Sequence, residues 1–404
     1  MIKTLNLQGR YLHFSGLLFI FMFTGTMNLR AQQAGNPYTL TDLKARQIQN
    51  SLTSNTADIA AYILDNFSTD HEKVRAIYTW IATHISYDIG RMLVISYDTA
   101  ENEKIIQTLK TRKGICENYS ALFEELCRKT GIPCYVIEGY TRQNGSIDQI
   151  PHSWCAARLE EAWYMFDPTW GSGYISERKF IKQFNNDYFM IRPADLIQTH
   201  MPFDYLWQFL PYPVSREEFS KGKILLKKTG TPFNFQDSIT VYEKLDKIAQ
   251  VRETIRRIEN NGTKNNLVRD RLRFLIQELE IEQQNVTVRQ YNAAVGDYNT
   301  GISSLNAFIQ YRNQKFTPVK PDAEIREMID FAVVRFRASL GILHGIILSD
   351  PVASANISSL DETCQQALAN AKEQQNWLEK YLAKEQNERP SMFYKPIRTY
   401  IPSN

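Results

Sequence analysis

A helix followed by strands is the pattern that most constrains the fold of this chain. Apolar residues recur at helical spacing over 116–130, and this stretch closes with a basic turn and a glycine. The next residues, 134–140, have the composition of a strand, and a polar loop over 141–151 follows. Two further strands are expected at 152–159 and 162–167, joined by a tight turn. This order predicts an α+β unit.

Three residues that could form a catalytic triad, a cysteine, a histidine and an aspartate, occur in that order within this pattern. Cys116 lies at the start of the expected helix, where free backbone N–H groups and the helix dipole stabilise a thiolate. His152 begins one strand and Asp167 ends the next, so a hairpin would bring the two together. A thiol nucleophile needs a base, and the base needs a third group that fixes its tautomer. The spacing therefore predicts a triad of Cys116, His152 and Asp167.

Several short segments around these residues match sequence motifs that are typical of one protein family. They are Gly114-Ile115-Cys116, Gly131-Ile132-Pro133, His152-Ser153-Trp154, Trp163-Tyr164 and Asp167-Pro168-Thr169-Trp170, with Ala76-Ile77-Tyr78-Thr79-Trp80-Ile81 and Ile85-Ser86-Tyr87-Asp88 upstream. The set resembles the transglutaminase-like superfamily, the permuted relatives of papain-type cysteine peptidases, over roughly residues 60–200. The resemblance implies a transglutaminase-like/papain-like catalytic domain. It also implies that Cys116 is the nucleophile, His152 the base and Asp167 the group that orients the base.

Acyl transfer through a thiol also needs hydrogen-bond donors for the oxyanion of the transition state. The backbone N–H of Cys116 is the first candidate. Trp80 is a second, because the resemblance to animal transglutaminases implies an upstream tryptophan in this role, although its place on an apolar helix face favours a core residue. Tyr87 is a third candidate, which either donates in the cleft or packs.

The other cysteines occupy apolar positions typical of structural residues. They are Cys127, Cys134, Cys155 and Cys364, of which the first two are candidates for a disulfide in an oxidising compartment. The sequence has no Cys-x-x-Cys pair, no histidine cluster with metal-ligand spacing and no calcium-loop pattern. We therefore expect no metal and no cofactor.

The N-terminus has the pattern of a secretory signal peptide. Lys3 and Arg10 precede an apolar run over 14–27, which is short for a membrane span. We predict a signal peptide at 1–31 and a secreted or periplasmic protein, with a membrane anchor as the alternative. Loss of Lys3, Arg10 and Arg30 lowers the net charge from +3 to 0, so charge gives no case for nucleic-acid binding. Membrane association after signal removal is not expected.

The second half of the chain is charged, favourable to helices and poor in glycine. Apolar stripes predict helices at 245–258, 267–313, 322–340 and 359–382. Such stripes pack into an antiparallel bundle or long hairpins. We therefore predict two domains, a catalytic domain at 36–215 and an α-helical bundle at 236–386. The bundle is expected to act as a scaffold or as a surface for a protein partner.

Together, the residues and the resemblance predict a secreted enzyme that transfers an acyl group of a peptide or protein amide. With water as the second substrate it is a cysteine peptidase or amidase, which we favour. With a lysine amine it is a cross-linking transglutaminase. A non-catalytic binding or scaffold module of the same fold is the rival prediction.

Overall fold

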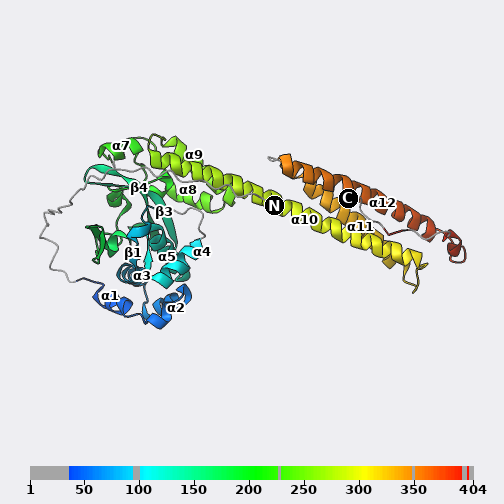
Figure 1. The fold of residues 1–404 in the computed structure, drawn as a ribbon, viewed down its shortest axis with the longest axis horizontal. Helices are drawn as coiled ribbons and strands as arrows, with labels where there is room; N and C mark the ends of the chain where they lie inside the picture. The colour runs from blue at the N-terminus through cyan, green and yellow to red at the C-terminus, as the bar shows by residue number, and fades with distance from the viewer. Residues whose placement is uncertain (1–35, 94–100, 226–228, 348–350, 394–397, 400–404) are drawn as a thin grey trace. The chain divides into compact units, whose positions relative to one another are not determined.

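A computed structural model describes residues 36–93, 101–225, 229–347, 351–393 and 398–399 of the 404-residue chain (Figure 1). The chain divides into two compact units, the first comprising Met1–Lys244 and Thr254–Leu272, the second Leu245–Glu253 and Arg273–Asn404. The predicted signal peptide at 1–31 lies outside the described residues. In the described part, no helix has the length and apolar character needed to cross a membrane.

The first unit is built on an antiparallel sheet of strand order β5-β4-β3-β8. Its strands are β3 (Cys134–Gln143), β4 (Ser146–Leu159), β5 (Ala162–Phe166) and β8 (His200–Pro202). β3 and β4 form a hairpin across Asn144-Gly145, whose φ angles of 49° and 82° suit a two-residue turn. The loop predicted at 141–151 is therefore wrong, because both strands continue to this turn.

α5 (Cys116–Lys129), whose position the sequence predicts, packs against the sheet. Phe123 of α5 meets Phe166 of β5 with ring centroids 5.3 Å apart. The helix ends before Gly131, whose φ of 80° lies in the left-handed region favoured after a helix. The first residue of α5 is thus held by a helix that is anchored on the sheet.

The helices that precede α5 complete the same core. α1 (Thr39–Arg46) and α2 (Thr56–Asn66) lead into α3 (Asp70–His84), which begins with a capping box of Thr69 and Glu72. Buried side chains of all three helices join those of α5 in one apolar cluster. The segment before α3 is therefore an integral part of the first unit.

A buried ion pair ties α1 to α3. The guanidinium of Arg75 donates to both carboxylate oxygens of Asp42, at 2.6 and 2.7 Å, and the Thr79 hydroxyl donates to the same carboxylate at 2.7 Å. The Arg75 and Asp42 side chains are 1% and 10% exposed. Because a buried charge is tolerated only when it is paired, each partner depends on the other.

The remaining elements of the first unit are short. β1 (Ser86–Tyr87) and β2 (Lys113–Gly114) pair in parallel immediately before α5. The others are α4 (Glu101–Thr111), β6 (Gly173–Ser176), β7 (Lys179–Lys182), α6 (Pro193–Leu196), α7 (Arg216–Lys221) and α8 (Phe235–Glu243).

The units do not divide at the predicted boundary of 236. The segment Thr254–Leu272, which contains the end of α9 (Lys247–Asn260) and the start of α10 (Asn266–Asn313), belongs to the first unit. A contact between charged groups holds this segment to the first unit: Arg257 Nε lies 2.9 Å from both carboxylate oxygens of the buried Asp204. Sequence periodicity identified these helices but not the charged group that holds one of them.

The second unit is helical. From Arg273 onward, α10 packs with α11 (Asp322–His344) and α12 (Pro351–Leu382) around buried aromatic and aliphatic side chains. Gly301 allows a close approach, since a Cβ there would lie 2.7 Å from the Phe336 ring. α12 begins at Pro351 rather than at the predicted Ser359, because proline is favoured in the first turn of a helix.

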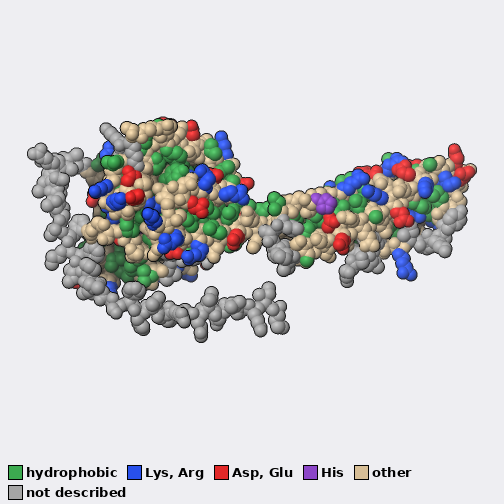
Figure 2. All heavy atoms as spheres, turned by 90° about the horizontal axis from the view of Figure 1, so that it is seen from above, with side chains coloured by type: hydrophobic (Ala, Val, Ile, Leu, Met, Phe, Trp, Pro, Cys, Tyr) green, Lys and Arg blue, Asp and Glu red, His purple; other side chains and the backbone are tan. Residues whose placement is uncertain are grey.

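A sheet-containing unit joined to a helical one makes the chain α+β, as predicted. On the face of the second unit shown in Figure 2, Lys and Arg side chains are interspersed with Asp and Glu. This mixed pattern is typical of a solvated helix surface.

Candidate active site

Cys116 is the first residue of α5 and is nearly buried. Just before it, the backbone N–H of Ile115 donates to Oδ1 of Asn118 at 3.0 Å. The Asn118 side chain therefore folds back over Gly114, where a Cβ would lie 2.4 Å from the Asn118 Cβ. Gly114 is needed for this close approach, and the turn presents the thiol at the positive end of the helix.

His152 on β4 and Asp167 after β5 meet in the structure. His152 Nε2 lies 2.7 Å from Asp167 Oδ2. The carboxylate is fully buried, and its Oδ1 accepts the backbone N–H groups of Thr169 and Trp170 at 2.9 and 3.0 Å. Since Nε2 faces the carboxylate, Nδ1 is the ring nitrogen of His152 that remains for Cys116.

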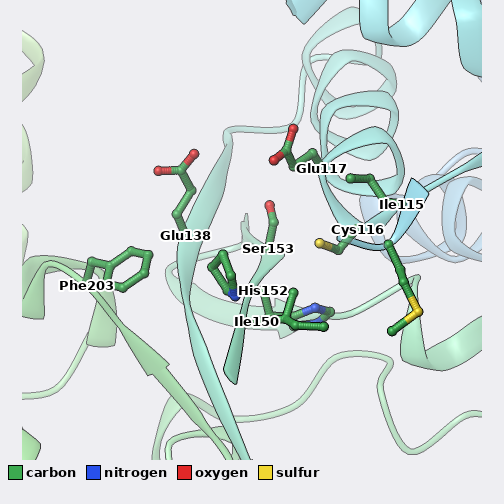
Figure 3. Close-up of a pocket in the computed structure, with 10 residues that line it drawn as sticks. Ile115, Cys116, Glu117, Glu138, Ile150, His152, Ser153 and Phe203 are labelled. Atoms are coloured by element: carbon green, nitrogen blue, oxygen red, sulfur yellow. The ribbon is translucent and has the colours of Figure 1, made fainter. Parts of the chain in front are cut away.

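Cys116 and His152 line one pocket, and the Cys116 side chain is close enough to influence the pKa of His152. Figure 3 shows the sulfur of Cys116 facing the β4 residues His152 and Ser153. The other residues of the lining are Met92, Ile115, Glu117, Glu138, Ile150, Pro151 and Phe203. The structure thus brings together the three residues predicted for the triad.

The electrostatic environment of His152 and Asp167 favours the charged form of both side chains. Burial opposes charge on His152, but the Asp167 carboxylate and the Cys116 side chain raise its pKa to about 10. Burial also opposes charge on Asp167, yet the charge on His152 and hydrogen bonds from His152 and His200 hold the pKa of that carboxyl well below its usual value. At neutral pH the pair is therefore an imidazolium and a carboxylate. A cation of this kind beside Cys116 is what a stable thiolate requires.

His200 on β8 is a site residue that the sequence analysis missed. Its Nε2 lies 3.2 Å from Asp167 Oδ2, and its Nδ1 lies 2.8 Å from the hydroxyl of Thr199. Burial lowers the pKa of His200, so the ring is neutral at neutral pH. No local pattern marks this histidine, because it reaches Asp167 only through the pairing of β8 with β3.

Among the described residues, His152, Asp167 and His200 form the one group of three side chains whose ligand atoms, all within 4.8 Å of one another, could hold a metal ion. Their contacts of 2.7 and 3.2 Å have the length of hydrogen bonds, so the group is fully explained as a proton network. The expectation of no metal and no cofactor remains a prediction.

The two side chains considered for the oxyanion lie in different places. Trp80 is fully buried in the main core, stacks on His84 at 5.3 Å and is not among the described residues that line the pocket. Tyr87 is half-buried and pairs with Gly114 through β1 and β2. Burial, followed by the charge of nearby Cys116, raises the pKa of Tyr87. Tyr87 therefore lies close to the thiol, whereas Trp80 packs as a core residue, and both oxyanion roles remain predictions.

Two carboxylates in the pocket were not predicted. Glu117 follows the cysteine on α5 and bonds to Lys104 at 2.7 Å, and Glu138 of β3 bonds to Arg271 at 2.6 Å. Each acid is balanced by a cation from the first unit, so the pocket does not carry a strong negative charge. A sequence pattern has no means of revealing such long-range pairs.

The remaining cysteines are free thiols. Cys127, Cys134 and Cys155 lie together in the first unit, and burial raises the pKa of each. The candidate disulfide between Cys127 and Cys134 is therefore not formed in this structure. Cys364 is buried in the core of the second unit.

Comparison with known proteins identifies the region that carries the site. Residues 57–168 match the model of the transglutaminase-like superfamily. The kyphoscoliosis peptidase of Homo sapiens is 34% identical over 205 residues, which cover 49% of this chain and 30% of that protein. The Lim and transglutaminase domain protein ltd-1 of Caenorhabditis elegans is 27% identical over 191 residues, which cover 43% of this chain and 26% of that protein.

Among solved structures, the periplasmic domain of TgpA from Pseudomonas aeruginosa aligns with a TM-score of 0.24 and 21% identity, covering 32% of this chain and 49% of that one. The chain spans less than a third of the length of the curated relatives described above. The superfamily match includes Cys116, His152 and Asp167, and it ends before the helical unit.

Proposed function

We propose that this chain is an enzyme that transfers an acyl group through the thiol of Cys116, and the match of residues 57–168 to the transglutaminase-like superfamily supports this proposal. The observation that carries the proposal is that Cys116 and His152 line one pocket, while His152 Nε2 lies 2.7 Å from the buried Asp167 Oδ2. A nucleophile beside a base, and a base oriented by a buried carboxylate, is the arrangement that covalent acyl transfer needs.

The reaction begins with the Cys116 thiolate and the His152 imidazolium. The sulfur attacks an amide carbonyl carbon, and the tetrahedral intermediate then expels the amine. His152 gives its Nδ1 proton to that amine as the C–N bond breaks, which leaves a thioester and a neutral imidazole. Asp167 keeps Nε2 protonated throughout. A water or an amine then attacks the thioester, His152 takes its proton, and the ion pair is restored.

We favour hydrolysis of peptide or protein amides. The kyphoscoliosis peptidase is named for peptidase activity, and this chain is similar to part of that protein. A lysine amine in place of water in the second step gives a cross-linking transglutaminase, and the triad chemistry is the same for both. Location outside the cytoplasm rests on the predicted signal peptide at 1–31, and the helical unit is proposed as a surface for a protein partner.

The first test is the rate at which iodoacetamide labels Cys116 between pH 5 and pH 9, followed by peptide mass spectrometry. An ordinary cysteine is only about 0.3% thiolate at pH 6. We therefore expect labelling at pH 6 to fall on the order of 10- to 100-fold in His152→Ala, which loses the imidazolium. The buried Cys364 in the same digest provides an internal comparison.

Equal, slow labelling at pH 6 in both proteins would contradict the enzyme and favour a non-catalytic binding module. If the labelling result supports the ion pair, glutamine-containing peptides are then incubated with and without a primary amine. Release of ammonia or of a shorter peptide without amine indicates hydrolysis. Mass gain by the amine indicates transamidation.

A further inference from the structure

The Asp167 carboxylate has more hydrogen-bond partners than a triad needs. Its Oδ1 accepts two backbone N–H groups, and its Oδ2 lies within reach of two imidazoles, those of His152 and His200. We propose that His200 is a positioning residue that shares Oδ2 with His152 and, by donating to it, weakens the hold of the carboxylate on the His152 proton. Its importance for turnover rests on the proposed function, whereas its effect on His152 does not.

The direction of the hydrogen bonds follows from the carboxylate. An ionised carboxylate only accepts, so the Nε2 atoms of both His152 and His200 carry hydrogen. His200 is neutral, so its Nδ1 has no hydrogen and must accept from the Thr199 hydroxyl at 2.8 Å. The hydrogen bonds therefore favour the tautomer of His200 that carries its hydrogen on Nε2, and the Thr199 hydroxyl stabilises this tautomer.

The strand order of the sheet places the imidazoles of His152 and His200 close together. β3 lies between β4 and β8, with Gly139 paired to His152 on one side and Thr141 paired to His200 on the other. Strands on either side of a third are about 9.6 Å apart, yet the two imidazole centroids are 5.6 Å apart. Gly139 has no room for a side chain, since a Cβ there would lie 2.6 Å from the Trp154 ring.

Two tryptophan side chains pack against the ring of His200. Trp154 and Trp170 pack edge-on against its ring, with centroids 5.1 and 4.6 Å away, and the same two indoles lie beside His152. His200 is 1% exposed. A neutral donor held this firmly acts as a fixed dipole, because it does not reorient when charge moves nearby.

The sign of its effect on His152 follows from electrostatics. The titratable groups that act on His200 are Asp167, His152 and, from β4, Asp148. The Nε2–H of His200 points its positive end at the carboxylate and therefore near the imidazolium of His152. This dipole stabilises ionised Asp167 and opposes the charge on His152. Its removal is therefore expected to make His152 a weaker acid, which slows proton delivery to the leaving amine.

The experiment follows the histidine Hε1 and Cε1 resonances of the full chain by NMR against pH. A Cys116→Ala background removes the thiol, so the readout does not depend on catalysis. In this background we expect His200→Leu to raise the titration midpoint of His152 by about 1 pH unit. His200→Gln places an amide donor at the same atom position, and we expect it to restore the midpoint to within about 0.3 unit.

A matched control is available in the second unit. His344 also pairs with an aspartate, Asp361, at 2.8 Å but is exposed, and His344→Leu should leave the His152 midpoint unchanged. An unchanged or lowered midpoint in folded His200→Leu would overturn the proposal, as would a failure of His200→Gln to restore it. If His200→Leu does not fold, Thr199→Val tests the same chain of donors, and it should raise the midpoint by a smaller amount, about 0.3 to 0.5 unit.

In the protein that retains Cys116, His200→Leu should lower kcat on the order of 10-fold with little change in KM, and His200→Gln should recover most of the loss. Slow iodoacetamide labelling of the wild type would contradict the enzyme itself. A fast-labelling wild type with an unshifted His152 in His200→Leu would contradict the role of His200 alone.

Discussion

The two units hold the same pair of groups in opposite surroundings. In the first, the Arg75 fork meets Asp42 at 2.6 and 2.7 Å with side chains 1% and 10% exposed. In the second, the Arg326 fork meets Glu379 at 3.0 and 3.3 Å with side chains 45% and 53% exposed. Water competes for the exposed pair and leaves it little net effect, whereas the buried pair leaves a costly charge if one partner is lost.

The same contrast holds for histidine. His152 and Asp167 form a buried pair, while His344 and Asp361 form an exposed one at nearly the same distance, 2.7 against 2.8 Å. In the second unit, apolar side chains pack between the helices, and the Arg326–Glu379 pair lies at the surface. Buried ion pairs therefore add to the apolar core of the first unit, whereas this exposed pair adds little to that of the second.

The largest expected effect comes from Asp42→Asn. The substitution leaves Arg75 charged, buried and without its carboxylate, so the free energy of unfolding of the first unit should fall by about 3–5 kcal/mol. Denaturant unfolding of the full chain measures it, with one probe for each unit because the units need not unfold together. A decrease in the free energy of unfolding below about 1 kcal/mol would show that the buried ion pair contributes no more than an exposed one.

An intermediate effect is expected when pH removes the charge from His152. Its folded pKa of about 10 lies above the ordinary value of 6.5, so its stabilising contribution is complete below pH 6.5 and disappears as pH rises through 10. The stability advantage of wild type over His152→Gln should therefore shrink between pH 6.5 and 10, by on the order of 2–4 kcal/mol. Thermal unfolding at several pH values measures this difference. A constant advantage would show that the pair is not an ion pair.

The smallest effect is expected from Glu379→Gln, the exposed counterpart of Asp42→Asn. Its cost should be about 0–1 kcal/mol and should vanish in high salt, because the charges are screened by solvent. The same denaturant experiment measures it in the second unit. A cost above about 2 kcal/mol, or one that salt does not change, would remove the distinction between the units.

The features that sequence analysis predicted correctly depend on local patterns. The start of α5 at Cys116 and its end before Gly131 each follow from a few neighbouring residues. The hairpin at Asn144-Gly145 also has a local signal, and it was overlooked because the surrounding residues are polar. Local information was therefore sufficient for α5, but it did not predict short elements such as α4, β6, β7 and β8.

The features that were missed depend on distant partners. His200 has no distinctive neighbours and joins the site only when β8 pairs with β3. The assignment of Thr254–Leu272 to the first unit depends on the contact of Arg257 with Asp204, 53 residues away. Periodicity reports the face of a helix that is buried, but it does not report the unit against which that face packs.

The partners of Asp167 lie at increasing distance along the chain: Thr169 and Trp170 at 2 and 3 residues, His152 at 15 and His200 at 33. Contacts of longer range close larger loops and carry a larger entropic cost, so they form later in folding. We therefore expect the contacts of Asp167 to form in order of increasing separation along the chain, with the turn at Thr169 and Trp170 first and His200 last. In that order, the hydrogen bond from His200 to Asp167 would form only when β8 has paired with β3.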